Sequence, residues 1–204
     1  MNLLLTGFGP FGEVTTNPAQ CIVETLAADP PRNDALRLHT AILPVAYDAA
    51  GERLRALIEV VRPDVILMLG VAGRRTDIAL ERIALNLDDS PTRPDNAGRA
   101  PDGAAIEPGA PLALASTLPL SELRDVFRAA GVPVAISNHA GAYLCNHAFY
   151  VGLRTVERLA LPARCGFIHV PMPRELSTDG AVDAPALADL VAAIRRCIIV
   201  LARP

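Results

Sequence analysis

The chain contains no lysine, and all 19 of its basic residues are arginine. This absence excludes every mechanism that depends on a lysine side chain. A P-loop nucleotide site, a pyridoxal-phosphate Schiff base, the β3 lysine of a protein kinase and a serine–lysine dyad all require one. The chain therefore belongs to none of these classes.

Cysteine is scarce, and no two of the four cysteines lie two or four residues apart: Cys21, Cys145, Cys165 and Cys197. That spacing excludes zinc-ribbon and thioredoxin-type motifs. We expect no bound metal and no other cofactor. Scattered, unpaired cysteines are typical of a reducing compartment, so we expect free thiols and a cytoplasmic location.

Long hydrophobic runs are missing as well. The first seven residues lack a basic region, and their apolar stretch is too short for a secretory signal. The most apolar late segment, Ala184–Ala202, is interrupted by Asp189, Arg195 and Arg196, so we do not expect it to span a membrane. A net charge of −3 gives no bulk attraction to nucleic acid or to an anionic membrane. We expect neither as a partner.

What the chain does contain is enough apolar sequence for one well-buried domain. Its 204 residues are 51% hydrophobic and 20% charged, and a chain of this size buries roughly 70% of its unfolded surface. Repeats and long linkers are absent, so we predict a single domain over residues 1–204.

Short apolar runs alternate with segments of helical periodicity. The runs predict strands at Leu3–Leu5, Leu36–Leu43, Val65–Leu69, Asp77–Leu87, Val132–Ser137 and Cys165–Val170. The periodic segments predict helices from the Asn17 cap to Ala28 and at Asp48–Arg62, Leu120–Ala130 and Ala142–Leu159. A last helix is predicted to begin at an Asp183 cap. Its apolar stripe consists of Leu187, Leu190, Val191, Ile194, Ile198 and Leu201. Asp88–Pro111 is rich in turn-forming residues and predicts a long loop or small excursion with a role in function or in assembly. This order predicts an α/β domain with a mainly parallel sheet covered on both faces.

A glycine-rich loop follows the first strand. Gly7–Gly12 matches the pattern G-x-G-x-x-G, which allows a nicotinamide-dependent oxidoreductase as one hypothesis. However, the predicted helix begins at Asn17, five residues beyond the third glycine, whereas a dinucleotide site needs that glycine in the opening of the helix. Phe8 and Phe11 make the loop better suited to a flat apolar ligand. They could equally pin the loop to the core.

Three residues fit the requirements of nucleophilic catalysis. Cys145 falls in the first turn of a predicted helix, where the helix dipole and free N–H groups lower a thiol pKa and can hold an oxyanion. His169 lies near the end of a predicted strand, and Glu81 could orient its imidazole.

Each of the three also has an ordinary structural interpretation. A single cysteine is usually a small buried apolar residue, and Glu81 could form a surface ion pair with Arg82. His139 and His147 compete with His169 as the base. His147 should point away, because residues two apart on a helix do not share a face, but spacing alone does not exclude His139.

Four blocks of sequence, in order along the chain, together resemble the pyroglutamyl peptidase I family. The blocks are Thr6–Gly12 with Asn17-Pro18, Glu81–Asn86 with Pro94-Asp95-Asn96, Ala140–His147, and Gly166–Pro171. The resemblance implies an α/β/α sandwich with a mainly parallel or mixed sheet, usually assembled as a tetramer. We therefore expect a homo-oligomer, either a tetramer or a dimer. The implied activity is that of a cysteine exopeptidase that removes an N-terminal pyroglutamyl residue from peptides and amides, without a cofactor.

The resemblance also implies individual roles. Glu81, Cys145 and His169 match the catalytic glutamate, nucleophile and base of the family. The residues that would line the lactam pocket or contact substrate are Phe8, Phe11, Tyr143, Leu144 and Arg93.

The chain departs from the family at three places. Val71 stands where many bacterial relatives carry glutamine, Tyr143 stands where phenylalanine is frequent, and the segment before Pro94 holds one extra residue, which makes Arg93 a shifted match to the arginine near the oxyanion. A relative that binds pyroglutamyl ligands without turnover is the alternative hypothesis.

Overall fold

The computed structural model describes residues 1–177 and 184–203. Within them, seven strands form one sheet: β1 (Asn2–Phe8), β2 (Arg37–Leu43), β3 (Val65–Val71), β4 (Ile78–Leu85), β5 (Ala113–Ala115), β6 (Val134–His139) and β7 (Arg164–Val170). Five helices cover it: α1 (Pro18–Ala28), α2 (Tyr47–Val61), α3 (Leu120–Ala129), α4 (Leu144–Arg158) and α5 (Leu187–Leu201).

The sheet is mixed. Its main path runs β2-β1-β3-β7-β4-β5, and β6 also pairs with β4. The pairs among β2, β1, β3 and β7 are parallel, whereas β4 runs antiparallel to β7. The carboxyl ends of β1, β3 and β7 therefore meet at one edge, where ligand sites of α/β folds gather.

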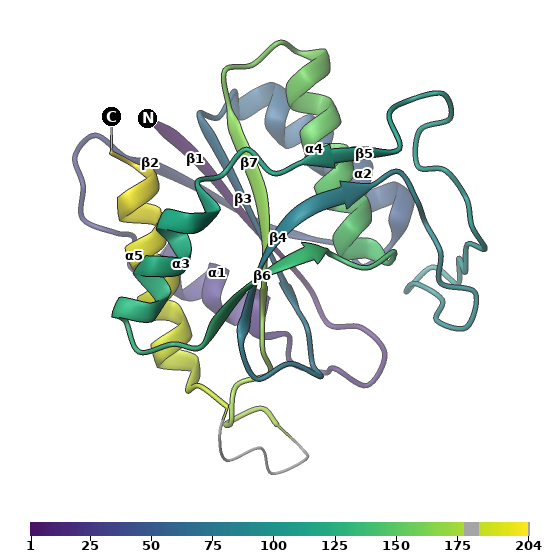
Figure 1. The fold of residues 1–204 in the computed structure, drawn as a ribbon. Coiled ribbons are helices and arrows are strands. Elements are labelled where there is room, and N and C mark those ends of the chain that lie inside the picture. Colours follow the sequence, from purple (N-terminus) through teal and green to yellow (C-terminus); the bar gives the residue numbers. More distant parts are fainter. Residues whose placement is uncertain (178–183, 204) are drawn as a thin grey trace.

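The helices form two layers, one on each face of the sheet (Figure 1). Helices α1, α3 and α5 share one apolar core with the sheet, and α2 and α4 share the other. β3 contributes to both cores, because alternate residues of a strand point to opposite faces: Leu67 packs into the first and Met68 into the second. This explains the uninterrupted apolar run and confirms the predicted α/β/α sandwich.

The first helix begins as predicted. Asn17 caps α1 by accepting a hydrogen bond from the Ala19 N–H at 3.0 Å, and Pro18 occupies the first helical position. The Asn17 side chain also donates to the Gly9 carbonyl at 2.9 Å. The same side chain thus ties the glycine loop to the helix that follows it.

The structure differs from the predicted elements at two places. The last helix begins at Leu187, with Ala186 as its N-cap, and the proposed Asp183 cap lies outside the described residues. The Leu187 N–H donates instead to the Glu175 side chain at 3.0 Å. The short strand β5 follows the long loop and was not predicted. Elsewhere the predicted elements are present with boundaries shifted by a few residues.

Asn146 joins α4 to β4 and to the residues after it through three partly buried hydrogen bonds. Its side-chain oxygen accepts from the Leu85 N–H at 2.8 Å, and its amide donates to the carbonyls of Leu85 and Leu87, each at 2.9 Å. The side chain is fully buried. These bonds fix the start of α4 against β4.

We expect Asn146→Ala to lower the free energy of unfolding by about 2–4 kcal/mol, because it leaves buried backbone groups unpaired. Urea unfolding measures the change. The matched control is Asn138→Ala, which removes one exposed 3.3 Å bond from Arg82 and should cost no more than ~0.5 kcal/mol. Equal losses in the two variants would contradict the proposed anchor.

Candidate active site

Glu81 and His169 are brought together by the antiparallel pairing of β4 with β7. Glu81 stands opposite Phe167, and His169 stands opposite Ala79, so the two side chains are diagonal neighbours on one face. The His169 Nδ1 atom lies 2.7 Å from Glu81 Oε1. Both residues are buried. Arg82, the next residue, points outward and donates to Asn138, so Glu81 does not form the surface ion pair considered above.

The Glu81 carboxylate acts on a single partner. Its other oxygen, Oε2, is buried and has no hydrogen-bond partner among the described residues. The lost hydration of a buried carboxylate must be compensated by its hydrogen-bond partners, and here His169 is the partner that the structure shows. The bond to Nδ1 also directs Nε2, the other ring nitrogen, away from Glu81.

Burial on its own would lower the pKa of His169. The negative charge and hydrogen bond of Cys145, followed by those of Glu81, outweigh this and raise the pKa of His169 to about 9. The imidazole is therefore charged at neutral pH, with the Glu81 carboxylate on one side and the sulfur of Cys145 on the other.

Cys145 lies at the second position of α4, directly after a turn in which Gly141 adopts a φ of +80°. This left-handed conformation favours glycine. The N-cap residue, Tyr143, makes no side-chain capping bond within the described part of the chain. The N–H groups of the first turn are thus available to an anion.

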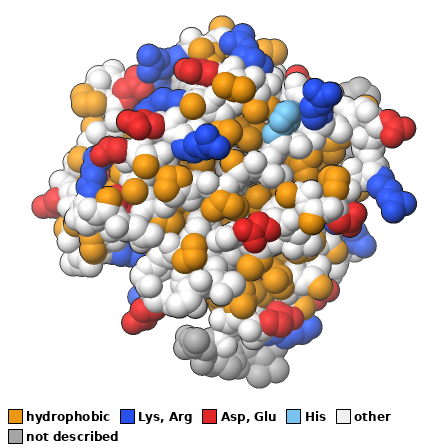
Figure 2. All heavy atoms as spheres, turned by 180° about the vertical axis from the view of Figure 1, so that it is seen from behind, with side chains coloured by type: hydrophobic (Ala, Val, Ile, Leu, Met, Phe, Trp, Pro, Cys, Tyr) orange, Lys and Arg blue, Asp and Glu red, His pale blue; other side chains and the backbone are white. Residues whose placement is uncertain are grey.

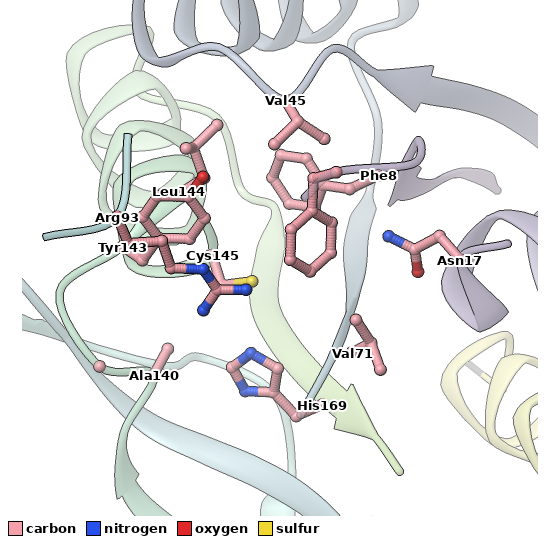
Figure 3. A pocket seen from close by; sticks show the side chains of 12 residues that line it. Phe8, Asn17, Val45, Val71, Arg93, Ala140, Tyr143, Leu144, Cys145 and His169 are labelled. Carbon is pink, nitrogen blue, oxygen red and sulfur yellow. The ribbon is translucent and has the colours of Figure 1, made fainter. Parts of the chain in front are cut away.

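A cavity of about 230 Å³ lies beside Cys145 and His169 (Figure 3). It brings together all five residues predicted to contact substrate: Phe8, Phe11, Tyr143, Leu144 and Arg93. Its wall is mostly apolar. Glu81 does not line the cavity but lies behind His169.

The sequence alone did not identify every residue of this cavity. Asn17, Val45, Val71, Ala140 and Gly141 also line it. The sequence predicts Asn17 as a helix cap and includes it in the family resemblance, but does not place it in the cavity. The position of Asn17 after β1, a strand whose carboxyl end faces the site, was a usable signal.

Arg93 stacks between two aromatic rings. Its guanidinium carbon lies 4.9 Å from the ring centre of Phe11 and 4.7 Å from that of Tyr143. These distances are typical of cation–π contacts. The Tyr143 hydroxyl donates to the Pro94 carbonyl at 3.2 Å, which holds the segment that carries Arg93.

The long loop after β4 is held in place by buried polar side chains. Asp95 accepts hydrogen bonds from three backbone N–H groups, those of Tyr47, Ala97 and Arg99. Asp88 contacts Nδ1 of His147, at 2.9 Å for its nearer oxygen. These bonds hold loop 86–112 against α2 and α4, and Arg93 of this loop lines the cavity.

The other histidines and cysteines face elsewhere. His147 is buried against Asp88, and the exposed His139 accepts from the Gly141 N–H at 3.1 Å. Burial raises the pKa of the thiols of Cys21, Cys165 and Cys197. In the described residues, no group of three histidine, cysteine or acidic side chains is placed to hold a metal ion.

A thiol in the first turn of a helix, beside an imidazole that a buried carboxylate orients, is the arrangement used by cysteine-dependent hydrolases. The fold and the site therefore define the class of cysteine-type hydrolases. The model of the pyroglutamyl peptidase family matches residues 1–203. The chain belongs to the pyroglutamyl peptidase family.

Sequence relatives and solved structures support the same family assignment. The chain is 38% identical over 202 residues to a pyrrolidone-carboxylate peptidase of Streptomyces coelicolor, covering 98% of this chain and 92% of the relative. It is 38% identical over 179 residues to the pyrrolidone-carboxylate peptidase of Thermococcus kodakarensis. That alignment covers 88% of this chain and 85% of the relative. The crystal structure of pyrrolidone carboxyl peptidase from Pyrococcus furiosus superposes with a TM-score of 0.91 at 35% identity, covering 98% and 97% of the two chains. The crystal structure of pyroglutamyl peptidase I from Bacillus amyloliquefaciens superposes with a TM-score of 0.90 at 32% sequence identity. The match covers 98% of this chain and 96% of that chain.

Gly70 leaves the space that Cys145 occupies. It lies on β3 opposite His169, and a Cβ added there would stand 2.8 Å from Cys145 Sγ and 2.8 Å from the Phe167 ring. We expect Gly70→Ala to slow alkylation of Cys145 by iodoacetamide and to cost about 1–3 kcal/mol of stability.

Peptide mapping after alkylation gives the labelling rate at each cysteine. Gly73→Ala is the matched control, because a Cβ at Gly73 would meet no atom within 4 Å. Unchanged labelling and unchanged melting temperature in Gly70→Ala would show that the site does not depend on this close approach.

Proposed function

We propose that this protein is a cysteine exopeptidase that hydrolyses the bond after an N-terminal pyroglutamyl residue in peptides and amides. The observation that carries the proposal is the Glu81–His169 bond beside Cys145 at the mouth of an aromatic-lined cavity. The activity for which the relatives are named supports the choice of substrate. A cavity of about 230 Å³ is smaller than the ~300–1,000 Å³ usual for drug-sized ligands, and suits a five-membered lactam.

In the proposed mechanism, Glu81 orients His169 and stabilises its positive charge, and His169 holds Cys145 as the thiolate. The sulfur attacks the carbonyl carbon of the pyroglutamyl residue and forms a tetrahedral oxyanion. N–H groups of the first turn of α4, with the guanidinium of Arg93 nearby, stabilise that charge.

His169 then gives its proton to the departing amine, and a thioester to Cys145 remains. Water, deprotonated by His169, attacks the thioester carbonyl and releases pyroglutamate and the thiolate. Phe8 and Phe11 would bind the lactam ring, with Tyr143 and Leu144 completing the pocket.

The setting of this activity is also a proposal. We propose that residues 1–204 act as one domain in the cytoplasm, as a homotetramer or homodimer. Two large apolar side chains, Val60 and Leu112, remain more than 80% exposed and could be covered by another subunit. None of the described helices is both long and apolar enough to cross a membrane. Figure 2 shows arginine and acidic side chains interspersed over the rear face, which favours neither nucleic acid nor an anionic membrane as a partner.

Release of a fluorophore from a pyroglutamyl amide tests the proposed function. We expect Cys145→Ala to abolish release while keeping the melting temperature, because the thiol is the nucleophile. Cys21→Ala, on the outer part of α1, should keep full activity. Hydrolysis by Cys145→Ala at the wild-type rate would refute the mechanism, and ligand binding without any turnover by the wild type would indicate the non-catalytic alternative.

The pH dependence follows from His169. Its pKa is raised to about 9, and the proposed reaction requires its protonated form, so kcat/KM should fall as pH rises through about 9. Because the pKa in the folded state lies above the ordinary value of 6.5, the ionised site also adds stability that is complete below pH 6.5 and is lost as pH rises through 9.

Glu81→Gln removes the charge that helps to hold the proton on His169. We expect the alkaline fall of kcat/KM to move to lower pH and turnover to decrease at least tenfold, without loss of fold. Glu122→Gln, on the exposed face of α3, is the control and should leave the profile in place. An alkaline limb that does not move in Glu81→Gln would contradict the assigned partnership.

A further inference from the structure

A second hollow continues from the cavity, and the site described so far makes no use of it. The groove has a volume of about 630 Å³ and shares Phe11, Val71 and Arg93 with the cavity. Its remaining lining is Val14 and the four residues after β3, Ala72, Gly73, Arg74 and Arg75.

The proposed reaction, on which this inference rests, determines which part of a substrate would enter the groove. The departing amine must lie at His169, because that imidazole supplies its proton. Gly70 and Val71 pair in register with His169 and Val170, and the Ala72 N–H donates to the Val170 carbonyl at 2.9 Å. The chain that leaves β3 therefore passes beside the imidazole, and a peptide leaving the cavity there runs over Ala72–Arg75.

The groove carries positive charge close to the bond that is cleaved. Three arginines line it, and the charge of Arg75 is offset by a two-pronged bond to Asp77 at 2.9 and 3.1 Å. In the part of the chain that the structure describes, no carboxylate forms a salt bridge with Arg74 or Arg93.

Negative charge lies farther away along the same surface. Glu13 and Glu175 line the next hollow, which adjoins the groove at Val14 and Gly73. The Arg174 side chain lies 3.7 Å from Glu175 and offsets part of that negative charge. The groove next to the cavity thus carries arginines, and the next hollow carries acidic side chains. Arg93 is visible in Figure 3 on the same side of the cavity as Cys145.

We infer that the groove binds the residue that follows the pyroglutamyl group and favours a carboxylate there. Two sources present this chemistry to Arg74 and Arg93: an aspartate or glutamate side chain at that position, or the free C-terminal carboxylate of a pyroglutamyl dipeptide. A lysine or arginine at that position is disfavoured by like charge.

The test compares kcat/KM for matched substrates. The tripeptide amides pGlu-Asp-Ala-NH2 and pGlu-Asn-Ala-NH2 differ only in side-chain charge, and the dipeptide pGlu-Ala and its amide differ only at the terminal carboxylate. We expect the charged member of each pair to be preferred roughly three- to tenfold at low salt, and the preference to weaken at high salt.

Arg74→Gln should reduce this preference, and Arg74→Glu should abolish or reverse it. The matched controls are Arg128→Gln and Arg128→Glu, since Arg128 is an exposed arginine on α3. A preference for only one of the two pairs identifies the source of the carboxylate and supports the inference. Wild-type ratios near one in both pairs, or ratios that Arg74→Glu leaves intact, would overturn it.

A binding arm separates this inference from the proposed function. Calorimetry on Cys145→Ala gives Kd ratios for the same pairs without turnover. If the wild type hydrolyses no pyroglutamyl substrate while the Kd ratios favour the carboxylates, the proposed reaction fails and the groove assignment stands. If the neutral substrates are hydrolysed but neither ratio departs from one, the groove assignment fails alone.

Discussion

The rest of the site depends on the contact between the buried carboxylate of Glu81 and the imidazole of His169. A carboxylate can be buried in a sheet only if an opposite charge or strong donors compensate its lost hydration. Here one histidine provides that compensation, and it is reached only because β4 runs antiparallel to β7. A parallel β4 would have a different pairing pattern with β7 and different neighbours for Glu81. The mixed topology of the sheet is therefore part of the site, because it brings Glu81 to His169.

The walls of the cavity come from segments that are far apart in the sequence but tied by buried polar bonds. Asn17 links the glycine loop to α1, Asp95 links loop 86–112 to the start of α2, and Asn146 links the start of α4 to β4. Each side chain satisfies backbone groups that would otherwise be unpaired in the interior. Irregular segments can thus hold Phe11 and Arg93 in fixed positions without belonging to a helix or a strand.

The sequence carried the local information well. Alternating apolar runs and helical periodicity predicted the α/β order, and helix starts such as Asn17-Pro18 have a local chemical cause. Prediction from the sequence failed where a residue far along the chain determines whether a helix begins or a strand forms. The first free N–H of α5 is satisfied by Glu175, twelve positions before Leu187, and no local signal indicates such a partner. β5 has three residues, Ala113–Ala115, and exists only because β4 offers it an edge.

In the site, too, the sequence indicates residues with a local signal and misses those that depend on distant contacts. Glu81, Cys145 and His169 could be proposed from residue type and position at element ends, and the structure places them together. Val45 and Val71 could not be assigned to the cavity, because apolar residues at loop entrances look alike in sequence. The Asp88–His147 contact was also missed, since it joins a loop to a helix 59 residues away.

The positive charge of Arg93 at the cavity bears on how the site distinguishes a pyroglutamyl end from a free N-terminus. An ordinary peptide begins with an ammonium group, whereas a cyclised pyroglutamyl end is neutral. An uncyclised chain that entered the cavity would bring its positive charge near the guanidinium of Arg93 and the charged imidazole of His169, and no carboxylate among the described residues lines the cavity to offset it. For an enzyme acting as proposed, the choice between blocked and unblocked peptides then rests on repulsion of the wrong terminus as much as on contacts with the right one. The fixed positive charge would thus disfavour chains with a free N-terminal ammonium group and favour chains whose N-terminus is neutral.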